Sequence, residues 1–534
     1  MRIGFGIVGL AVLAASAALA LPLPGGGDAV GAEAAPEGQA PAALGAPDFQ
    51  PTPERPIGWR GDGTGHYPGA TPPTTWARTD KGEKTNIVWE TRLPCYSWAT
   101  PIIVGGRIFV RSEPYDLLCL DKKDGKILWL RSHGPQVAIT AEEKNANPAL
   151  GALDPLLAKL QEVNDAYVTQ GPSPQLLKQK HDLQHQINDL LKKAERKYRL
   201  PPDMYVESWS GYTGATPCSD GKHVYFMSGS GVTGCYDLDG NLQWTKFYSC
   251  ADNWGEHGDP TSPGLAGSKL LVYGPRALNA ETGAELWCVP LANARGGQSY
   301  AMVPFKVGGQ DFAAIGNQFV RVSDGKSLFN AQLFIGTTPV LHGSELYFIA
   351  MTWKTCGFRC EAQGPDGLKV TALKTVELPG PADPSKKWEP TSDYYTAGPL
   401  YHDGLLYVVG NWGKFSVTDM QKGELVYTKQ LPCDFKNGFH RKTYGTGIGA
   451  SLVMAGQHIY LTDNAGCTLV LEPGREYKLL AKNNLDYVFP KGWEGWERGH
   501  WDGPRHETTL ATPIFEGARI YIRGEQNLYC IGEK

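Results

Sequence analysis

Short apolar segments alternate with polar turns along most of the chain. The first complete unit begins at Ala99-Thr100-Pro101, continues through apolar strands at Ile108-Phe109-Val110 and Leu117–Asp121, and ends at Ile127-Leu128-Trp129. Segments of this length, with Pro at the first position and Gly in the intervening turn, are typical of short antiparallel strands. The pattern therefore predicts a repeated β unit whose last strand carries a large aromatic side chain.

Eight such units follow one another. Repetition of a strand unit is the sequence pattern of a β-propeller, in which each unit forms one blade of a closed ring. We therefore predict an all-β fold, an eight-bladed β-propeller over residues 56–534. The seven later units begin at Ala215-Thr216-Pro217, Thr261-Ser262-Pro263, Met302-Val303-Pro304, Thr337-Thr338-Pro339, Ala397-Gly398-Pro399, Gly449-Ala450-Ser451 and Ala511-Thr512-Pro513.

The last unit stops at Lys534 without an outer strand, whereas a spare strand precedes the first unit. The segment Asn86-Ile87-Val88-Trp89-Glu90 has the apolar and aromatic pattern of an outer strand. A closed ring leaves no open strand edge. We therefore expect this N-terminal strand to pair with the final repeat and to close the propeller.

A helical insertion separates the first unit from the second. Apolar side chains recur at helical spacing from Leu156 to Val163 and again from Leu183 to Ala194. We predict an α-helical hairpin insertion over 140–203, with its two helices within 152–198. The hairpin is expected to project from the ring or to lie against it. Because it interrupts the chain between two complete units, we expect it to serve a partner contact rather than the stability of the ring.

Two histidines in the second helix have a spacing that occurs in metal sites. His181 and His185 lie four residues apart, so both side chains project from one face of the helix. No third ligand residue stands nearby, and the segment is rich in Lys and Gln. We interpret this face as solvated and assign no metal site.

The N-terminus has the organisation of a signal peptide. Arg2 precedes an apolar run, and Ala18-Leu19-Ala20 matches a small-residue cleavage site. We predict a signal peptide at 1–20, cleaved after Ala20, and hence an extracytoplasmic protein, either periplasmic or secreted. An uncleaved segment that anchors the chain in a membrane is the alternative. The Ala-, Pro- and Gly-rich residues 21–55 predict a disordered linker, because they carry few large apolar groups to bury.

Composition narrows the choice of partners and the role of the cysteines. The chain has 51 Lys and Arg against 55 Asp and Glu, a formal charge of −4, so no general attraction to nucleic acid or to an anionic membrane is expected. Cys356 and Cys360 are the one close pair and could form a local disulfide. Four other cysteines lie within apolar strand segments and are interpreted as small core residues, namely Cys119, Cys235, Cys467 and Cys530.

The repeat resembles that of a known family. Asp121…Gly125…Trp129 and Glu281-Thr282-Gly283…Trp287 are similar to the tryptophan-docked repeat of the PQQ-like superfamily, and the run from Gly58 to Gly65 is similar to the lead-in of its large members. This group includes quinoprotein alcohol dehydrogenases and the BamB-type component of outer-membrane protein assembly. The resemblance implies the propeller fold and two classes of function, a BamB-like binding protein or a dehydrogenase that uses PQQ with Ca²⁺.

The chain departs from both classes. No two cysteines are adjacent, although the dehydrogenases carry a vicinal pair over the quinone, and we assign no set of Glu, Asn and Asp ligands for Ca²⁺. A Cys-x-x-Cys-His motif for covalent haem is absent, and the lipobox Cys of the BamB type is absent too, since the first Cys is Cys95. We favour a non-catalytic binding or scaffold protein of the cell envelope and assign no catalytic residue. The alternative is a PQQ/Ca-dependent quinoprotein dehydrogenase without its own haem domain.

The connections that precede the inner strands are unusually aromatic and charged. In a propeller these connections converge on one face around the axis, where a ligand or partner commonly binds. We predict a ligand-binding funnel that engages a protein, peptide or glycan, with the chain acting as a monomer. The residues assigned to this funnel are Trp98, Trp209, Tyr212, Trp254, His257, Asp259, Tyr300, His440, Arg441, Tyr444, His500, Trp501, Arg505 and His506.

Overall fold

The protein is seen here in a computed structural model. It describes residues 41–198, 212–248, 261–272, 274–289, 301–331, 337–350, 353–364, 366–380, 395–433, 447–487, 505–507 and 509–533. The chain divides into Met1–Pro41 and a body formed by Ala42–Lys534. The predicted signal peptide at 1–20 lies outside the described residues. Within the described ranges, neither of the long helices combines the length and the hydropathy needed to span a bilayer.

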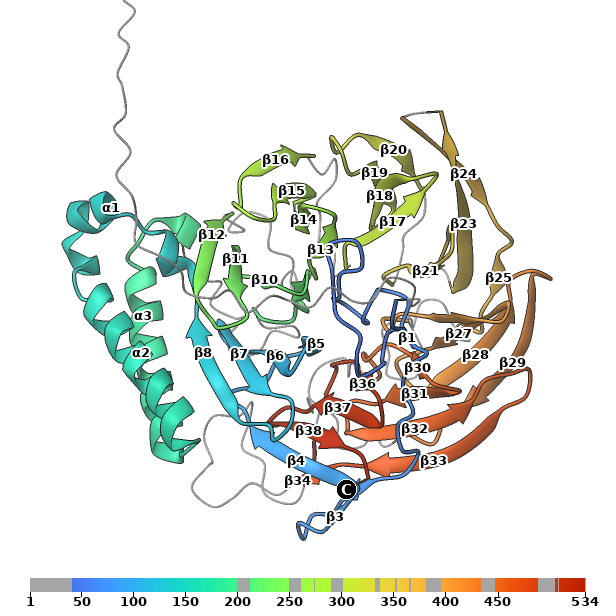
Figure 1. Cartoon of the computed structure of the whole chain (residues 1–534), viewed down its shortest axis with the longest axis horizontal. Helices are drawn as coiled ribbons and strands as arrows, with labels where there is room; N and C mark the ends of the chain where they lie inside the picture. Colours follow the sequence, from blue (N-terminus) through green and yellow to red (C-terminus); the bar gives the residue numbers. More distant parts are fainter. Residues whose placement is uncertain are drawn as a thin grey trace, which may run out of the picture. The chain divides into compact units, whose positions relative to one another are not determined.

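Eight antiparallel sheets form the body, and we number them as blades 1–8 in the order of their inner strands (Figure 1). The prediction of an eight-bladed propeller is confirmed. From inner to outer, the strands of blade 1 are β5 (Ile102–Val104), β6 (Arg107–Ser112), β7 (Asp116–Asp121) and β8 (Ile127–Ser132). Those of blade 2 are β9 (Cys218–Ser219), β10 (His223–Met227), β11 (Val232–Asp237) and β12 (Leu242–Phe247). Blade 3 has β13 (Gly264–Ala266), β14 (Lys269–Val272), β15 (Arg276–Asn279) and β16 (Glu285–Cys288), and blade 4 has β17 (Val303–Val307), β18 (Gln310–Ile315), β19 (Gln318–Arg321) and β20 (Ser327–Asn330).

Blades 5–8 follow the same order, with an extra strand in two of them. Their strands are β21 (Val340–His342), β22 (Glu345–Ala350), β23 (Lys354–Gln363) and β24 (Gly367–Ala372), with β25 (Val376–Glu377) also paired to β23; β26 (Leu400–His402), β27 (Leu405–Val409), β28 (Lys414–Asp419) and β29 (Glu424–Gln430); β1 (His66–Tyr67), β30 (Val453–Ala455), β31 (His458–Thr462), β32 (Cys467–Glu472) and β33 (Lys478–Asn484); and β36 (Ile514–Glu516), β37 (Arg519–Arg523), β38 (Asn527–Ile531) and β4 (Ile87–Arg92). Two small pairs remain, β2 (Ala77–Arg78) with β3 (Lys84–Thr85) and β34 (Asp486–Tyr487) with β35 (Arg505–His506).

The N-terminal strand closes the ring, as the sequence predicts. Strand β4 pairs antiparallel with β38, and Trp89 lies opposite Cys530 in this ladder. A second link between the last blade and the first is a hydrogen bond from the Thr512 backbone N–H to the Thr100 hydroxyl, at 3.1 Å. Blade 8 is therefore built from both ends of the body, and its outer edge is paired by β4.

A ladder irregularity adjoins the outer aromatic side chain in blades 1, 2, 3, 4, 6 and 8. In blade 1 the pairing of β7 with β8 shifts by one residue directly after Trp129 pairs with Cys119. A bulge of this kind re-aims a side chain. The Trp129 ring lies over Gly240 of blade 2, and its Nε1 donates to the Leu238 carbonyl at 3.0 Å. A Cβ on Gly240 would come within 2.8 Å of the indole, so glycine leaves the space that the ring occupies.

Tryptophan docking recurs around half of the ring and then changes. At the junction of blades 4 and 5 the corresponding ring, Phe329, packs instead on Phe358, with the centroids 5.1 Å apart. An aromatic side chain therefore also lies between blades 4 and 5, but it packs on a phenylalanine and not on a glycine. The tryptophan pairs are Trp89 over Gly125, Trp129 over Gly240, Trp244 over Gly283 and Trp287 over Gly325.

Hydroxyl groups at the start of the inner strands link one blade to the next. At six junctions a backbone N–H of one blade donates to the Ser or Thr hydroxyl of its neighbour, and these hydroxyl-bearing residues are buried. The Thr of the Thr-Pro motif therefore acts as an interblade acceptor beside the axis. The donor–acceptor pairs are Thr100–Thr216, Thr216–Ser262, Ala301–Thr338, Gly398–Ser451, Ser451–Thr512 and Thr512–Thr100, at 3.0–3.1 Å.

The insertion forms the predicted hairpin, and it lies against the ring. Helices α2 (Leu153–Gln170) and α3 (Pro174–Leu191) pack together, with Leu160 and Ile187 in their shared core. Ser173 caps α3 by accepting from the Leu176 backbone N–H. The shorter elements of the insertion are η1 (Pro135–Ala138), α1 (Ala141–Ala146), η2 (Pro148–Leu150) and η3 (Arg196–Tyr198).

A buried polar network joins the hairpin to blade 1. The Lys180 ammonium forms an ion pair with Asp116 at 3.1 Å, and both side chains are almost fully buried. Lys180 also donates to Asn164 at 2.6 Å, and Asn164 donates to Ser132 at 3.0 Å. Tyr167 packs within the main core and donates to the Arg92 carbonyl of β4. The hairpin is therefore part of the core around blades 1 and 8, in contrast to the expectation that the ring does not depend on it.

The residues just before the first strand are ordered and cross the inner strands. We call residues 42–67 the N-terminal strap (dark blue in Figure 1). Leu44 and Phe49 are buried in the main hydrophobic core. The Gly517 backbone N–H donates to the Gly45 carbonyl at 2.6 Å, and β1 adds in parallel to β30. The linker predicted over 21–55 is therefore wrong for 42–55, because these few apolar residues are spaced so that each reaches a gap between inner strands.

The described cysteines are free thiols. Cys119, Cys235, Cys467 and Cys530 are buried, which confirms their interpretation as core residues. The possible bridge between Cys356 and Cys360 does not form, since both lie within the single strand β23 as buried free thiols.

Candidate functional site at the loop face

The strands define two faces of the propeller. In each blade, the connection that enters the inner strand and the turn between the second and third strands lie at the same end of the antiparallel strands. The Glu113 backbone N–H, in such a turn, accordingly donates to the Tyr96 carbonyl in such a connection. We call this end the loop face and the opposite end the turn face. Trp98 and Tyr212, in the described parts of the connections that enter blades 1 and 2, lie at the loop face.

Two of the predicted funnel residues have described side chains. Trp98 is half-buried, and its ring packs against Tyr96 with the centroids 5.6 Å apart. Tyr212 is only 1% exposed and packs on Tyr115, so its ring supports the loop face from within and does not line an open funnel. For Arg505 and His506 the structure gives the backbone of β35 only. The other predicted residues lie outside the described ranges, namely Trp209, Trp254, His257, Asp259, Tyr300, His440, Arg441, Tyr444, His500 and Trp501.

A buried carboxylate holds the end of the connection between blades 1 and 2. Glu113 is 3% exposed and accepts from the backbone N–H groups of Tyr212 and Thr213, at 2.9 and 2.8 Å. The Thr213 hydroxyl is a third donor, at 2.5 Å. A buried carboxylate is costly unless its oxygens are hydrogen-bonded, and these donors satisfy both of them. The residues that follow segment 199–211, where Trp209 lies, are thereby fixed.

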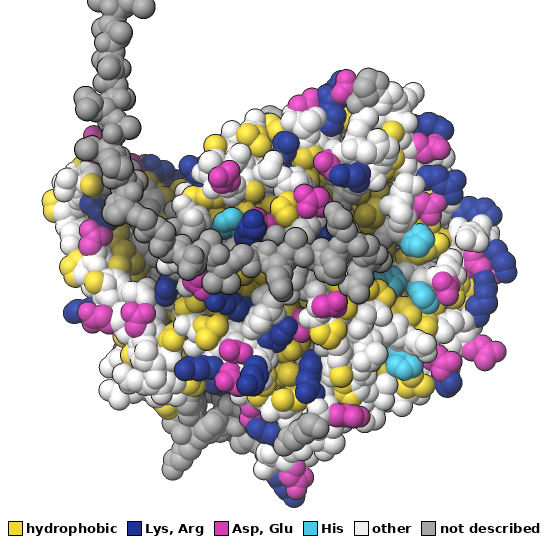
Figure 2. Space-filling view, viewed as in Figure 1, with side chains coloured by type: hydrophobic (Ala, Val, Ile, Leu, Met, Phe, Trp, Pro, Cys, Tyr) yellow, Lys and Arg dark blue, Asp and Glu magenta, His cyan; other side chains and the backbone are white. Residues whose placement is uncertain are grey.

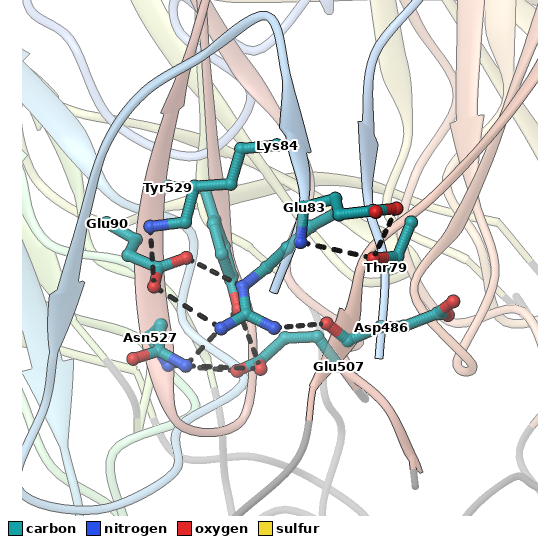
Figure 3. Close-up of polar contacts among 9 residues, drawn as sticks. Thr79, Glu83, Lys84, Glu90, Asp486, Glu507, Asn527 and Tyr529 are labelled. Atoms are coloured by element: carbon teal, nitrogen blue, oxygen red, sulfur yellow. Dashed lines mark hydrogen bonds and ion pairs between the residues drawn. The ribbon is translucent and has the colours of Figure 1, made fainter. Parts of the chain in front are cut away.

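A second carboxylate occupies the same kind of position in blade 8. Glu507 accepts from the backbone N–H groups of Gln526 and Asn527, at 2.6 and 2.9 Å, and from the Tyr529 hydroxyl at 3.0 Å. Burial, followed by the charge of Glu507, raises the pKa of Tyr529 well above its ordinary value, which keeps this hydroxyl a donor. Glu507 closely follows segment 488–504, and these hydrogen bonds connect it to the turn between the second and third strands of blade 8 (Figure 3).

The other end of segment 488–504 is held by an arginine. Arg78 donates to the Asp486 carbonyl at 2.7 Å and pairs with Glu90 at 2.8 Å (Figure 3). Burial opposes the ionisation of Glu90, but hydrogen bonds from Arg78 and Lys84 outweigh it and lower the pKa of this carboxyl. The pairing of β34 with β35 brings the two ends of the segment together. The predicted residues His500 and Trp501 lie in the sequence between these ends.

An asparagine performs the same task between blades 6 and 7. Asn411 is fully buried, and its side-chain carbonyl accepts from the Thr396 hydroxyl at 2.9 Å. The Asn411 backbone carbonyl accepts from the Ile448 N–H, also at 2.9 Å. Thr396 and Ile448 follow segments 381–394 and 434–446. One side chain thus connects the ends of two long connections.

Sequence reasoning did not find these anchoring residues. Glu113 and Asn411 come within two residues of the end of the second strand of their blades. A polar residue at that position, in a repeat whose neighbouring residues are apolar, is the signal that would have identified two of the three anchors. Glu507 precedes an inner strand instead and carries no comparable signal.

The described residues give no ligand set on which a Ca²⁺ site could be placed. Over the parts of the chain that the structure describes, no group of three or more His, Cys, Asp or Glu side chains could hold a metal ion. The buried carboxylates at the loop face have their oxygens committed to backbone and hydroxyl donors. We therefore derive no chemical step through a quinone or a metal.

The sheets, the docked tryptophans and the ring closure define an eight-bladed β-propeller of the tryptophan-docked class. A family model described as outer membrane protein assembly factor BamB matches residues 80–157, which span the closing strand, blade 1 and the start of the hairpin. Over residues 80–157 the chain is therefore similar to the PQQ-like repeat family.

One solved structure supports the fold, and a second shows similarity only. A quinohemoprotein alcohol dehydrogenase from Comamonas testosteroni is 10% identical, with a TM-score of 0.50, over 84% of this chain and 77% of that one. BamB from Moraxella catarrhalis is 14% identical, with a TM-score of 0.36, over 58% of this chain and 94% of that one. No curated protein sequence matches the chain significantly. At such identities the likeness concerns the fold alone, and it does not choose between binding and catalysis.

Proposed function

We propose that the chain is a non-catalytic binding propeller of the cell envelope that engages a protein, peptide or glycan through its loop face. The observation that carries the proposal is the set of buried anchors, Glu113, Asn411 and Glu507, that hold the ends of the long connections. The segments that precede these anchored ends contain six of the fourteen residues assigned to the funnel, namely Trp209, His440, Arg441, Tyr444, His500 and Trp501.

Fixed loop ends favour recognition because they reduce what must be ordered on binding. Ordering a flexible loop costs free energy that lowers affinity, and a preorganised frame removes part of that cost. Aromatic and Arg side chains at the centre of such a frame are the residue types that dominate binding interfaces. Figure 2 shows acidic and basic side chains intermixed over the face of the molecule that it presents. The formal charge of −4 on the whole chain gives no reason to expect broad attraction to a polyanion.

A comparison of loop-face and turn-face variants tests the proposal. Immobilised full chain would be exposed to native envelope extract, beside the loop-face variants Trp98→Ala and Trp501→Ala. The turn-face variant Lys123→Ala is the matched control, since Lys123 is exposed in a turn at the opposite end of blade 1. We expect a partner that wild type and the control retain and that both loop-face variants lose. A partner lost equally from the control would contradict binding at the loop face.

The dehydrogenase alternative is tested with the same protein. Purified chain would be incubated with PQQ and Ca²⁺, and quinone binding and dye-linked alcohol oxidation would be measured. We expect neither saturable binding nor turnover. A stoichiometric quinone complex that oxidises alcohols would replace the binding role with a catalytic one.

A further inference from the structure

A second concave site lies at the axis, on the side away from the loop face. A cavity of about 350 Å³ is enclosed between residues 53–63 of the N-terminal strap and the inner strands β13 and β17. Its size falls within the range of about 300–1,000 Å³ that is typical of small-molecule pockets. It would hold roughly ten water molecules at about 30 Å³ each.

The cavity exists because the strap fills only one side of the central channel. Ile57 exchanges backbone hydrogen bonds with Ser219 of blade 2, and β1 pairs with β30 of blade 7. The strap therefore follows blades 7, 8, 1 and 2 and leaves the inner strands of blades 3 and 4 uncovered. The uncovered strands form the opposite wall of the cavity.

A tight turn inserts two side chains into the channel and fixes the strap wall. Gly58 and Gly61 exchange backbone hydrogen bonds at 2.7 and 3.1 Å, so Trp59 and Arg60 occupy the tip of the turn. The Arg60 guanidinium is fully buried and donates to the Pro399 and Leu452 carbonyls, at 2.7 and 2.5 Å. It also lies 5.1 Å from the Trp59 ring. The wall is thus anchored to blades 6 and 7 on the far side of the channel.

The wall of the cavity is apolar apart from its rim. Trp59 and Ile57 line it from the strap, and Leu265, Met302 and Phe305 line it from blades 3 and 4. Such a surface binds an apolar body by removing it from water, at about 25 cal/mol per Å².

Two carboxylates that line the cavity, those of Asp62 and Glu54, are exposed and form no ion pair among the described residues. Asp62 lines the cavity and is exposed, and its Oδ1 accepts from the Thr64 backbone N–H and hydroxyl, at 3.0 and 2.5 Å. Among the described residues no Lys, Arg or His side chain forms an ion pair with Asp62. Asp311, at the rim, is already paired with Lys306 at 3.4 Å. Asp62 thus offers a negative charge beside an apolar surface.

We propose that this cavity binds a small organic cation, an ammonium group on a compact apolar or aromatic body, with the ammonium paired to Asp62 and the body against Leu265 and Phe305. A charge-assisted hydrogen bond to a carboxylate is stronger than a neutral one, and an aromatic surface attracts a cation further. Among the charged residues that line the cavity, Glu54, Asp62 and Asp311 outnumber Arg55 and Lys306, so an anion of the same size is disfavoured. A neutral ligand would displace water from the carboxylate without replacing its charge partner.

Three probes with the same aromatic body and different charge test the proposal. Phenethylammonium, 2-phenylethanol and phenylacetate would be titrated calorimetrically into the full chain. We expect saturable binding of the ammonium, at least tenfold weaker binding of the alcohol and no binding of the carboxylate. Equal affinity for the three probes, or no saturable binding of any, would overturn the proposal.

Matched variants locate the binding site. Asp62→Asn keeps the shape and an acceptor for Thr64, so it should weaken ammonium binding about tenfold and leave the alcohol unchanged. Leu341→Trp, at the cavity wall, should abolish binding of both. Asp239→Asn removes an exposed carboxylate of blade 2 outside the cavity and should change neither. Unchanged ammonium binding in Asp62→Asn would refute the role of this carboxylate. These results are independent of the loop-face experiment, because no residue is shared.

Discussion

Replacing the glycine under a docked tryptophan should destabilise the propeller far more than replacing an equivalent glycine in open space. Gly240 and Gly82 form a matched pair. Both have φ +84°, and both donate a turn hydrogen bond to the residue three positions earlier, Asp237 and Thr79. They differ in their surroundings: a Cβ on Gly82 would meet nothing within 4 Å, whereas one on Gly240 would meet the Trp129 indole at 2.8–2.9 Å.

The expected magnitudes follow from these surroundings. A side chain in the left-handed region costs about 1–2 kcal/mol in either turn, so Gly82→Ala should lower the free energy of unfolding by about that amount. In Gly240→Ala the Trp129 ring must also move. The ring is 5% exposed and its Nε1 is hydrogen-bonded to Leu238. Overpacking of a core adds about 1–3 kcal/mol, and a strained hydrogen bond adds about 1 kcal/mol. The two variants should therefore differ by about 2–4 kcal/mol.

Guanidinium denaturation of the two variants and wild type, followed by circular dichroism, measures the difference. A double-mutant cycle with Trp129→Phe then isolates the contact, because the smaller ring leaves room for the new methyl group. The loss in Gly240→Ala/Trp129→Phe should be smaller than the sum of the single losses by at least about 1 kcal/mol. Equal losses in Gly82→Ala and Gly240→Ala, or strict additivity in the cycle, would refute the account of tryptophan docking.

Three further outcomes are expected. A chain that starts at residue 42 should keep the free energy of unfolding of the body. A chain that starts at residue 56 lacks Leu44 and Phe49 and should lose several kcal/mol of this free energy in denaturation, because each large apolar side chain removed costs about 2–5 kcal/mol. Equal stability of the two chains would contradict a stabilising role of the strap. Replacing 140–198 with a Gly/Ser linker removes Tyr167 and Leu177 from the main core and should cost about 2–5 kcal/mol for each of these side chains. An unchanged melting temperature would show that the hairpin is dispensable. Hydrogen bonds from Lys197 and Thr140 lower the pKa of Glu143 to about 2. The stability that Glu143 gives α1 should therefore be present above pH 4.5 and be lost toward pH 2. Amide hydrogen exchange in α1 should show this loss in wild type but not in Glu143→Gln.

The propeller could be predicted from the sequence because the blades repeat the same local sequence features. Thr-Pro at the inner strand, glycine in the outer turn and an aromatic residue after it recur often enough to count eight blades. The closing strand was predictable for a related reason: Trp89 carries the outer-strand pattern at one end of the chain, and the last repeat lacks it at the other.

The features that escaped prediction depend on contacts between distant, non-repeated segments. The strap reads as a linker because its composition is poor in large side chains, yet Leu44 and Phe49 suffice to fix it once inner strands provide gaps. Lys180 reads as part of a solvated helix face, since nothing local indicates that Asp116 lies opposite. In the funnel, Tyr212 belongs to the right face but is buried by Tyr115, a partner from another blade. The sequence pattern therefore indicates on which face of the propeller a residue lies more readily than it indicates whether the side chain is exposed.

Blade 8 can be completed only after the C-terminal strands have been synthesised, because it combines strands from both ends of the body. Strand β4 emerges early but has no partner until β38 has been made, and the bond between Thr512 and Thr100 joins residues 412 positions apart. Long-range pairings of this kind form late, and until then unpaired edges are exposed to aggregation. A chain that stops before β38 leaves the edge of β4 unpaired. Full length is thereby a condition for a closed surface.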